Sequence, residues 1–164
     1  MKTIYILRHC KSAWDNPSLS DIERPLNSRG KKDAPLMAEV MKRMDFLPQL
    51  VILSPSVRTR LTVAPIIEMF KISKDQIAIE SLLYHGGPDD FEQIIQRLDD
   101  DIDNALLVGH NPGITYIANK CLGKHIDNVP TGGLLKIYSD VKEWRDFEFS
   151  KSKLKKFLYP KMFK

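Results

Sequence analysis

Arginine and histidine side chains follow three separate apolar runs of the sequence. Arg8 and His9 come directly after the run at residues 4–7, Arg58 comes shortly after the run at 50–53, and His110 follows the run at 105–108 after one glycine. Arginine matches phosphate oxygens with a planar fork of donors, and a neutral histidine can attack phosphorus to form a covalent intermediate. The pattern predicts phosphoryl transfer, with His9 as nucleophile, Arg8 holding the phosphoryl group, and the second histidine donating to it.

The segments around these residues predict the fold that would bring them together. Short apolar runs alternate with amphipathic helical patterns, which is typical of a largely parallel sheet covered on both faces. The carboxyl ends of parallel strands share one edge, so the arginines and histidines can converge there. The predicted strands lie at 4–7, 50–53, 77–79 and 105–108, and the predicted helices begin near 27, 54–56, 88 and 114. Residues 134–138 and 144–149 predict an antiparallel pair of strands.

Prolines fall within two of these predicted helices. Asn27 can cap the first helix, but Pro35 indicates a start that is irregular or later than Asn27. Pro65 predicts a kink in the second helix. Its inner side is expected to carry Leu61, Ala64, Ile67, Met69 and Phe70.

Length and composition set broad bounds. The 164 residues predict one domain over 1–164, and 43% hydrophobic with 28% charged residues is ordinary for a soluble globular protein. The first strand begins almost at the N-terminus and no apolar run is long enough to span a bilayer, so we expect a cytoplasmic protein. The net charge of +4 suits anionic substrates but is too small to indicate nucleic acid. Cys10 and Cys121 are far apart and suggest neither a disulfide framework nor a zinc site.

Several motifs together resemble those of a known family. The sequence LRHC at residues 7–10 resembles the Arg-His-Gly signature of the histidine phosphatase superfamily, and the whole chain resembles its bacterial SixA-type phosphohistidine phosphatase branch. The motifs DIERPLNSRG at 21–30, SPSVRT at 54–59, VGHNPG at 108–113 and VPTGG at 129–133 follow in the family's order. The resemblance implies a phosphoglycerate-mutase-like, three-layer α/β/α sandwich with a mostly parallel sheet and an antiparallel strand near the C-terminus.

The resemblance also implies roles for individual residues. His9 would be the phosphorylated nucleophile, and Arg8, Arg58 and His110 would form the phosphate pocket, with no metal and no cofactor. Asp21 matches the position where this branch has an aspartate near an Arg-Pro pair, so it is the candidate general acid. The alternative for Asp21 is a turn or helix-capping aspartate.

Two other residues near the motifs leave alternatives open. His85 is a weaker candidate for the acid, the alternative being a loop residue that hydrogen-bonds its surroundings. Cys10 stands where the family usually has glycine, and we interpret it as a packed thiol, the alternative being a redox-sensitive thiol beside the nucleophile.

These features lead to a functional hypothesis with two alternatives. The chain is expected to be a metal-independent phosphatase that acts through a phosphohistidine intermediate and dephosphorylates protein phosphohistidine. An imidazole leaving group can depart protonated, whereas an alkyl phosphate needs a well-placed acid. The alternatives are a small-molecule phosphomonoesterase and a non-catalytic phosphate-binding module. The expected partner is therefore a phosphohistidine carrier protein or a small phosphate ester, not nucleic acid or a membrane.

The C-terminal segment 151–164 mixes lysines with aromatic residues. We expect a solvated tail that Leu154, Phe157 and Leu158 anchor to the body. Binding to nucleic acid or a membrane surface, and docking of an acidic phosphocarrier domain, are the alternatives for this segment.

Overall fold

A mixed β-sheet forms the centre of the computed structural model, which describes residues 1–123 and 125–164. Within these residues the sheet has six strands in the order β3-β2-β4-β1-β5-β6. Strands β3, β2, β4 and β1 are mutually parallel, and β5 runs antiparallel to both of its neighbours. The strand bounds are β1 Lys2–Arg8, β2 Leu50–Leu53, β3 Ile77–Ile79, β4 Asn104–Gly109, β5 Leu134–Ser139 and β6 Lys153–Leu158.

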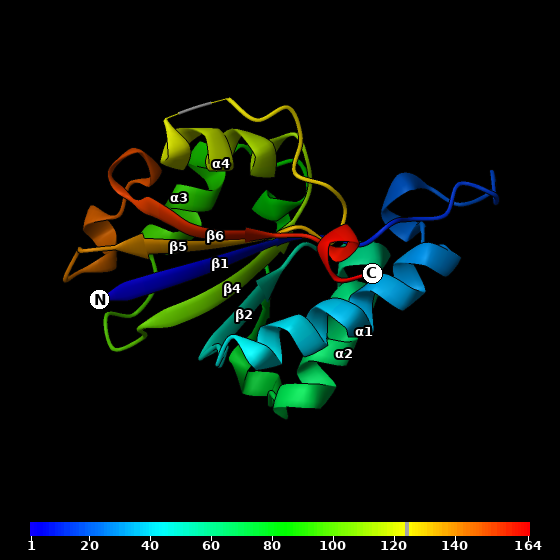
Figure 1. The fold of residues 1–164 in the computed structure, drawn as a ribbon, viewed down its shortest axis with the longest axis horizontal. Coiled ribbons are helices and arrows are strands. Elements are labelled where there is room, and N and C mark those ends of the chain that lie inside the picture. Colours follow the sequence, from blue (N-terminus) through cyan, green and yellow to red (C-terminus); the bar gives the residue numbers. More distant parts are fainter. Residues whose placement is uncertain (124) are drawn as a thin grey trace.

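Helices cover both faces of this sheet. They are α1 Ser28–Arg43, α2 Val57–Phe70, α3 Pro88–Gln96 and α4 Gly113–Leu122. Figure 1 shows α1 and α2 against one face and α3 and α4 against the other. Successive side chains of β1 alternate between the two cores, with Ile4 and Ile6 on the α3 and α4 side and Tyr5 and Leu7 on the α1 and α2 side. The predicted three-layer α/β/α sandwich with a mostly parallel sheet is confirmed.

Polar caps determine where the first two helices begin. The side chain of Asn27 accepts a hydrogen bond from the backbone N of Gly30 at 2.9 Å, and α1 begins at Ser28. The expectation of an irregular or later start because of Pro35 is therefore wrong, since this proline lies inside the helix. The side chain of Ser56 caps α2 in the same way, accepting from the backbone N of Thr59 at 3.3 Å. This cap places Arg58 in the first turn of α2.

The buried side of α2 differs from the predicted one. Leu61 and Ala64 are exposed, so these two were wrongly assigned to the inner side, whereas Ile67, Met69 and Phe70 do pack against the core on this side of the sheet. Two threonines occupy buried positions that the apolar pattern does not reveal, and Thr62 uses its hydroxyl to accept a hydrogen bond from the backbone N of Cys10 at 2.9 Å. The buried residues of α2 are Arg58, Thr59, Thr62, Val63 and Ile66.

Residues 144–149 do not form the predicted strand. They contain the short 3-10 turn Trp144–Asp146 and the start of a second turn, Phe149–Lys151. Trp144, Phe147 and Phe149 are all fully buried in the core on the α3 and α4 side. The indole N–H of Trp144 donates to the carbonyl of Ile102 at 2.8 Å. The alternating apolar pattern therefore reflects a turn that inserts aromatic rings into one core.

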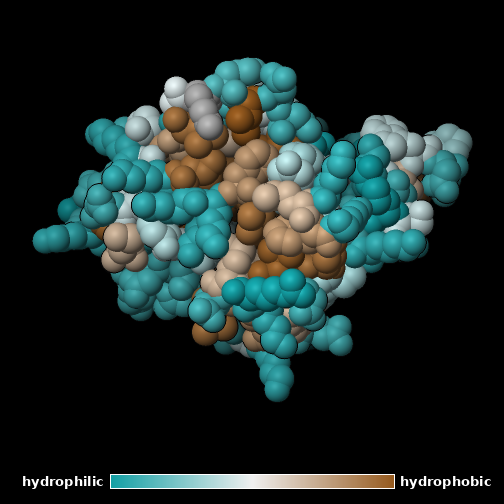
Figure 2. All heavy atoms as spheres, viewed as in Figure 1, coloured by the Kyte–Doolittle hydropathy of each residue, from teal (hydrophilic) through white to brown (hydrophobic). Residues whose placement is uncertain are grey.

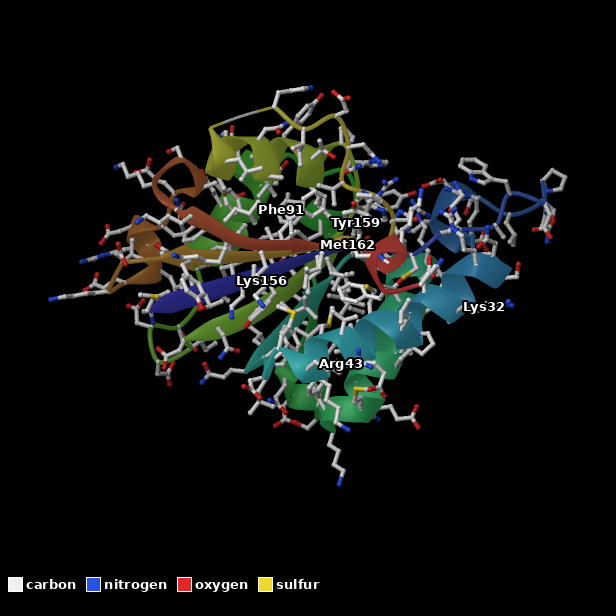
Figure 3. All side chains as sticks on the ribbon, viewed as in Figure 1. Lys32, Arg43, Phe91, Lys156, Tyr159 and Met162 are labelled. Carbon is white, nitrogen blue, oxygen red and sulfur yellow. The ribbon has the colours of Figure 1, made fainter. Side chains whose placement is uncertain are left out.

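The antiparallel partner of β5 is instead β6, within the segment that we expected to be a solvated tail. Leu154 and Phe157 pack against one core and Leu158 against the other, so the predicted anchoring is confirmed while the tail conformation is wrong. The lysines of β6 face solvent, and Figure 2 shows hydrophilic side chains over much of this face of the molecule. Figure 3 labels Lys156 on this strand, with Tyr159 and Met162 where the chain turns beyond it.

None of the helices among the described residues is long and apolar enough to cross a membrane.

Candidate active site

The carboxyl ends of β1, β2 and β4 lie side by side and carry the predicted site residues. Arg8 of β1 pairs with Gly109 of β4, so His9 and His110 follow at neighbouring strand ends. The backbone N of His9 donates to the carbonyl of Gly109 at 3.2 Å, and the two imidazole centroids are 5.0 Å apart. Arg58 reaches the same place from the first turn of α2. A cavity of about 310 Å³ is lined by Arg8, His9, Asp21, Arg58 and His110, among others.

The imidazole of His9 is held in one orientation. Its Nδ1 lies 2.7 Å from the carbonyl oxygen of Cys10. A carbonyl only accepts hydrogen bonds, which assigns the ring proton to Nδ1 and leaves the lone pair on Nε2. Burial lowers the pKa of His9 to about 4; the bond to the Cys10 carbonyl opposes this shift, and Arg58 and Arg8 add to it. The ring is therefore neutral at neutral pH, the state that a nucleophile requires.

His110 is also neutral and anchored. Its Nε2 lies 2.8 Å from Oγ of Ser54, which in turn accepts from the backbone N of Ser56 at 3.3 Å. The Ser54 hydroxyl can thus donate its own proton to Nε2, which leaves the ring proton of His110 on Nδ1. Burial, then the nearby His9 and Arg58, lowers the pKa of His110 to about 3.

Three buried polar atoms of the cavity residues have no hydrogen-bond partner among the residues that the structure describes. They are Nε of Arg8, Nε of Arg58 and Nδ1 of His110. Other donors of the two arginines are occupied, since Nη1 of Arg8 donates to the carbonyl of Val129 at 2.8 Å and Arg58 binds Asp21. A buried donor without a partner costs about 1–3 kcal/mol. An anion such as a phosphoryl group would satisfy all three donors.

Asp21 lies at the rim of this cavity in the 3-10 turn Asp21–Glu23, and its carboxylate is surrounded by donors. Oδ1 accepts from Nε and Nη2 of Arg24 at 3.1 and 2.9 Å. Oδ2 accepts from Nη2 of Arg58 at 3.0 Å and from the hydroxyl of Tyr84. These hydrogen bonds, that of Tyr84 first, hold the pKa of Asp21 well below its usual range. A carboxylate in this state has no proton to give, so this geometry does not fit the expected general acid.

Sequence reasoning missed two residues that organise the cavity. Arg24 is buried, and besides Asp21 it binds Oγ of Ser12 at 2.7 Å. Tyr84 donates to Asp21, and its ring centroid lies 4.1 Å from that of His85, which is exposed at the cavity mouth. Both residues adjoin positions that the sequence had singled out, Arg24 in the Arg-Pro pair and Tyr84 next to His85. Their roles depend on contacts between distant segments.

Cys10 is fully buried beneath the site and packs against Leu26 and Ala34. Burial raises the pKa of its thiol to about 12, so the thiol stays protonated and agrees with the packed-thiol interpretation. Beside it Gly132, at φ 74°, donates its backbone N to the carbonyls of Arg8 and His9 at 3.1 and 3.0 Å. A side chain at this position would meet Pro160, which explains the need for glycine.

No group of three or more His, Cys, Asp or Glu side chains within residues 1–123 and 125–164 is arranged to hold a metal ion.

Sequence relatives match parts of the chain. The model of the histidine phosphatase superfamily, branch 1, matches residues 4–82, which include His9 and Arg58. An uncharacterised chloroplastic protein of Arabidopsis thaliana is 41% identical over 61 residues, covering 37% of this chain and 28% of that protein. The matched stretch is therefore less than a third of the plant protein. An uncharacterised protein of Mycobacterium leprae is 23% identical over 94% of this chain and 100% of its own length.

Solved structures share the fold over nearly the whole chain. A protein of Agrobacterium tumefaciens assigned as the phosphohistidine phosphatase SixA superposes with a TM-score of 0.82 at 24% identity, covering 97% of this chain and 98% of that one. The protein histidine phosphatase SixA bound to tungstate superposes with a TM-score of 0.83 at 20% identity, with 99% of each chain covered. A mycobacterial glucosyl-3-phosphoglycerate phosphatase superposes with a TM-score of 0.68 at 12% identity, covering 94% of this chain and 97% of that one. The model of the histidine phosphatase superfamily thus matches the part of the chain that carries His9 and Arg58, and the solved structures share the fold of nearly the whole chain.

Proposed function

We propose that this phosphatase works through a phosphohistidine intermediate at Nε2 of His9, without a metal, and that it dephosphorylates phosphohistidine on proteins. The observation that carries the proposal is the 2.7 Å hydrogen bond from Nδ1 of His9 to the Cys10 carbonyl. This bond leaves the Nε2 lone pair free on a neutral ring, beside the unpaired donors of Arg8, Arg58 and His110.

In the first step Nε2 of His9 attacks the phosphorus and forms a P–N bond. The bond from phosphorus to the departing imidazole breaks, and that imidazole leaves as a neutral ring if its other nitrogen carries a proton. Negative charge spreads over the equatorial oxygens of the transferring group. Nε of Arg8, Nε of Arg58 and Nδ1–H of His110 donate to these oxygens and stabilise the charge.

In the second step water attacks the phosphorus of phosphorylated His9. The P–N bond breaks, the electron pair returns to Nε2, and the inorganic phosphate that leaves keeps the oxygen and both protons of the water. The net reaction is hydrolysis. The depressed pKa of His9 favours the neutral product ring, which is ready for the next cycle.

The state of Asp21 supports an imidazole leaving group. An ionised Asp21 positions Arg58 and Arg24 and supplies no proton to a departing alkoxide. Phosphohistidine needs no such proton donor at this place, whereas an alkyl phosphate does. The structural similarity to SixA phosphohistidine phosphatases supports the same substrate class.

A small-molecule phosphomonoesterase is the second candidate. The similarity in fold to a mycobacterial sugar-phosphate phosphatase favours it, and a cavity of about 310 Å³ can hold a small ester. The oriented neutral ring of His9 counts against a non-catalytic binding module, because anion binding alone requires no nucleophile.

The test is to incubate the protein with phosphoramidate, stop the reaction with base, and map phosphate by peptide mass spectrometry. We expect acid-labile phosphate on His9 and none on the His9→Ala variant. Turnover with phosphate on no residue, or on another residue, would overturn the mechanism. Faster turnover of a sugar phosphate than of a phosphohistidine protein would favour the small-molecule candidate.

A further inference from the structure

The catalytic cavity continues into a hollow on each side. One hollow shares Lys11, Ser12 and Trp14 with the cavity and extends along residues 25–28 to Lys31. The hollow on the other side shares Tyr84, His85, His110 and Asn111 with it and extends to Tyr116. The three spaces therefore form one groove, with His9 near its middle, and a small phosphate ester would occupy only the central part.

Trp14 stands on one wall of this groove as an exposed but fixed aromatic ring. Its indole is 72% exposed, although it stacks on the guanidinium of Arg24 with 3.4 Å between Cζ and the ring centroid. Arg24 is itself buried and anchored by Asp21 and Ser12. Figure 1 shows the loop of residues 13–26, in blue, projecting on the side of the sheet where β1 ends. A ring that is already ordered loses little entropy when a partner covers it.

The far end of the groove has a floor of bare backbone and a second exposed aromatic ring. A side chain at Gly113 would meet the carbonyl oxygen of Gly86 at 2.0 Å, so the two backbones touch and no side chain fills the space between them. Tyr116, one helical turn further along α4, is 56% exposed and lines this hollow. The hollow between Tyr116 and the phosphate cavity has a volume of about 280 Å³, which leaves room for a chain that lies across it.

The charges favour a polypeptide with an acidic character on the Trp14 side. Lys11 and Lys31 line that hollow, with Asp15 as its acidic residue. Opposite charges across an interface speed encounter and select among partners.

We propose that this groove binds the polypeptide on both sides of a phosphohistidine, with Trp14 and Tyr116 as its aromatic anchors. The inference rests on the function proposed above and adds that the flanking chain, beyond the phosphoryl group, determines which substrates are used. Aromatic residues are enriched among the side chains that dominate binding energy at protein interfaces, which supports this assignment.

The test keeps the leaving group constant and changes only the flanking chain. The substrates are free phosphohistidine and a peptide of about ten residues, roughly 30 Å when extended, with phosphohistidine in its middle and acidic residues on one side. We expect a kcat/KM at least about tenfold higher for the peptide, mainly through a lower KM. Trp14→Ala and Tyr116→Ala should each reduce the peptide's advantage over free phosphohistidine by about fivefold to tenfold.

Matched variants control for effects on folding. Leu47 is also exposed but precedes β2, at the opposite edge of the sheet, so Leu47→Ala should leave the advantage of the peptide unchanged. Trp14→Phe keeps an aromatic ring over Arg24 and should retain most of the peptide's advantage in kcat/KM over free phosphohistidine. Equal kcat/KM for both substrates, or an advantage that survives both alanine variants, would overturn the inference while the phosphoenzyme at His9 still stands. Failure of both substrates to phosphorylate His9 would instead overturn the proposed function and the inference with it.

Discussion

Asp21 and Arg58 are joined at two points. Nη1 of Arg58 donates to the backbone carbonyl of Asp21 at 2.7 Å, and Nη2 donates to Oδ2 at 3.0 Å. The pair ties the long first loop to the first turn of α2, and it fixes the guanidinium plane so that Nε is left for the phosphoryl group. We therefore propose that Asp21 is a positioning residue, a role that differs experimentally from that of a general acid.

The first prediction concerns Asp21→Asn. The substitution keeps the backbone contact to Arg58 but removes the charge that pairs with Arg58 and Arg24, so kcat/KM should fall by about tenfold. The fall should be the same for aryl phosphates with good and with poor leaving groups, because no proton transfer is lost. The measurement is kcat/KM across such a series for the wild type and the variant. A loss that grows steeply as the leaving group becomes more basic would show that Asp21 is the acid after all.

The second prediction concerns the pKa values of the two histidines. NMR titration of the free protein should give a midpoint near pH 4 for His9 and near pH 3 for His110, because burial disfavours their charged forms. Midpoints near the ordinary value of about 6.5 would contradict the neutral, buried site.

The same shifts predict how stability depends on pH. Between about pH 4 and 6.5 the unfolded chain binds protons at His9 and His110 that the folded protein excludes. The free energy of unfolding should therefore rise with pH across this window. The stability contributed by the two neutral histidines is fully present above about pH 6.5 and is lost as the pH falls toward 4. Urea denaturation at pH 7 and at pH 5 measures this change in the free energy of unfolding. A His9→Phe, His110→Phe double variant should show a smaller change between the two pH values. An equal change in the double variant would show that groups other than His9 and His110 cause the pH dependence of stability.

The fourth prediction concerns Cys10. In a Cys121→Ala background, iodoacetamide should leave the native protein unmodified and active, because the Cys10 thiol is buried and protonated. Cys10→Ala should retain activity and lose roughly 1 kcal/mol of stability through the small cavity that it creates. Rapid alkylation with loss of phosphatase activity would instead support a reactive thiol beside the nucleophile.

The parts of this protein that could be predicted from sequence are those encoded locally. The run that forms β1 ends directly at Arg8 and His9, and parallel topology then determines which other strand ends lie beside it. Strand β6 could not be predicted in the same way, because the lysines that protect an exposed sheet edge also resemble a solvated tail. The strand predicted at residues 144–149 is absent, because buried aromatic residues spaced along a turn have the same apolar pattern as a strand.

The ionisation state of Asp21 likewise cannot be predicted from the local sequence. Its partners Arg58 and Tyr84 are 37 and 63 positions away in the sequence. A motif can indicate that an aspartate is present near an arginine, but only the folded chain determines whether that aspartate keeps a proton.

The central claim is that Nε2 of His9 carries the phosphoryl group, and the most direct measurement is ³¹P NMR of the protein treated with phosphoramidate under alkaline quench. We predict one phosphohistidine signal with the chemical shift of the Nε2-linked isomer, lost in His9→Ala. The reason is that Nδ1 is engaged with the Cys10 carbonyl. A signal of the Nδ1-linked isomer, or turnover of phosphoramidate with no phosphohistidine signal at all, would contradict the account.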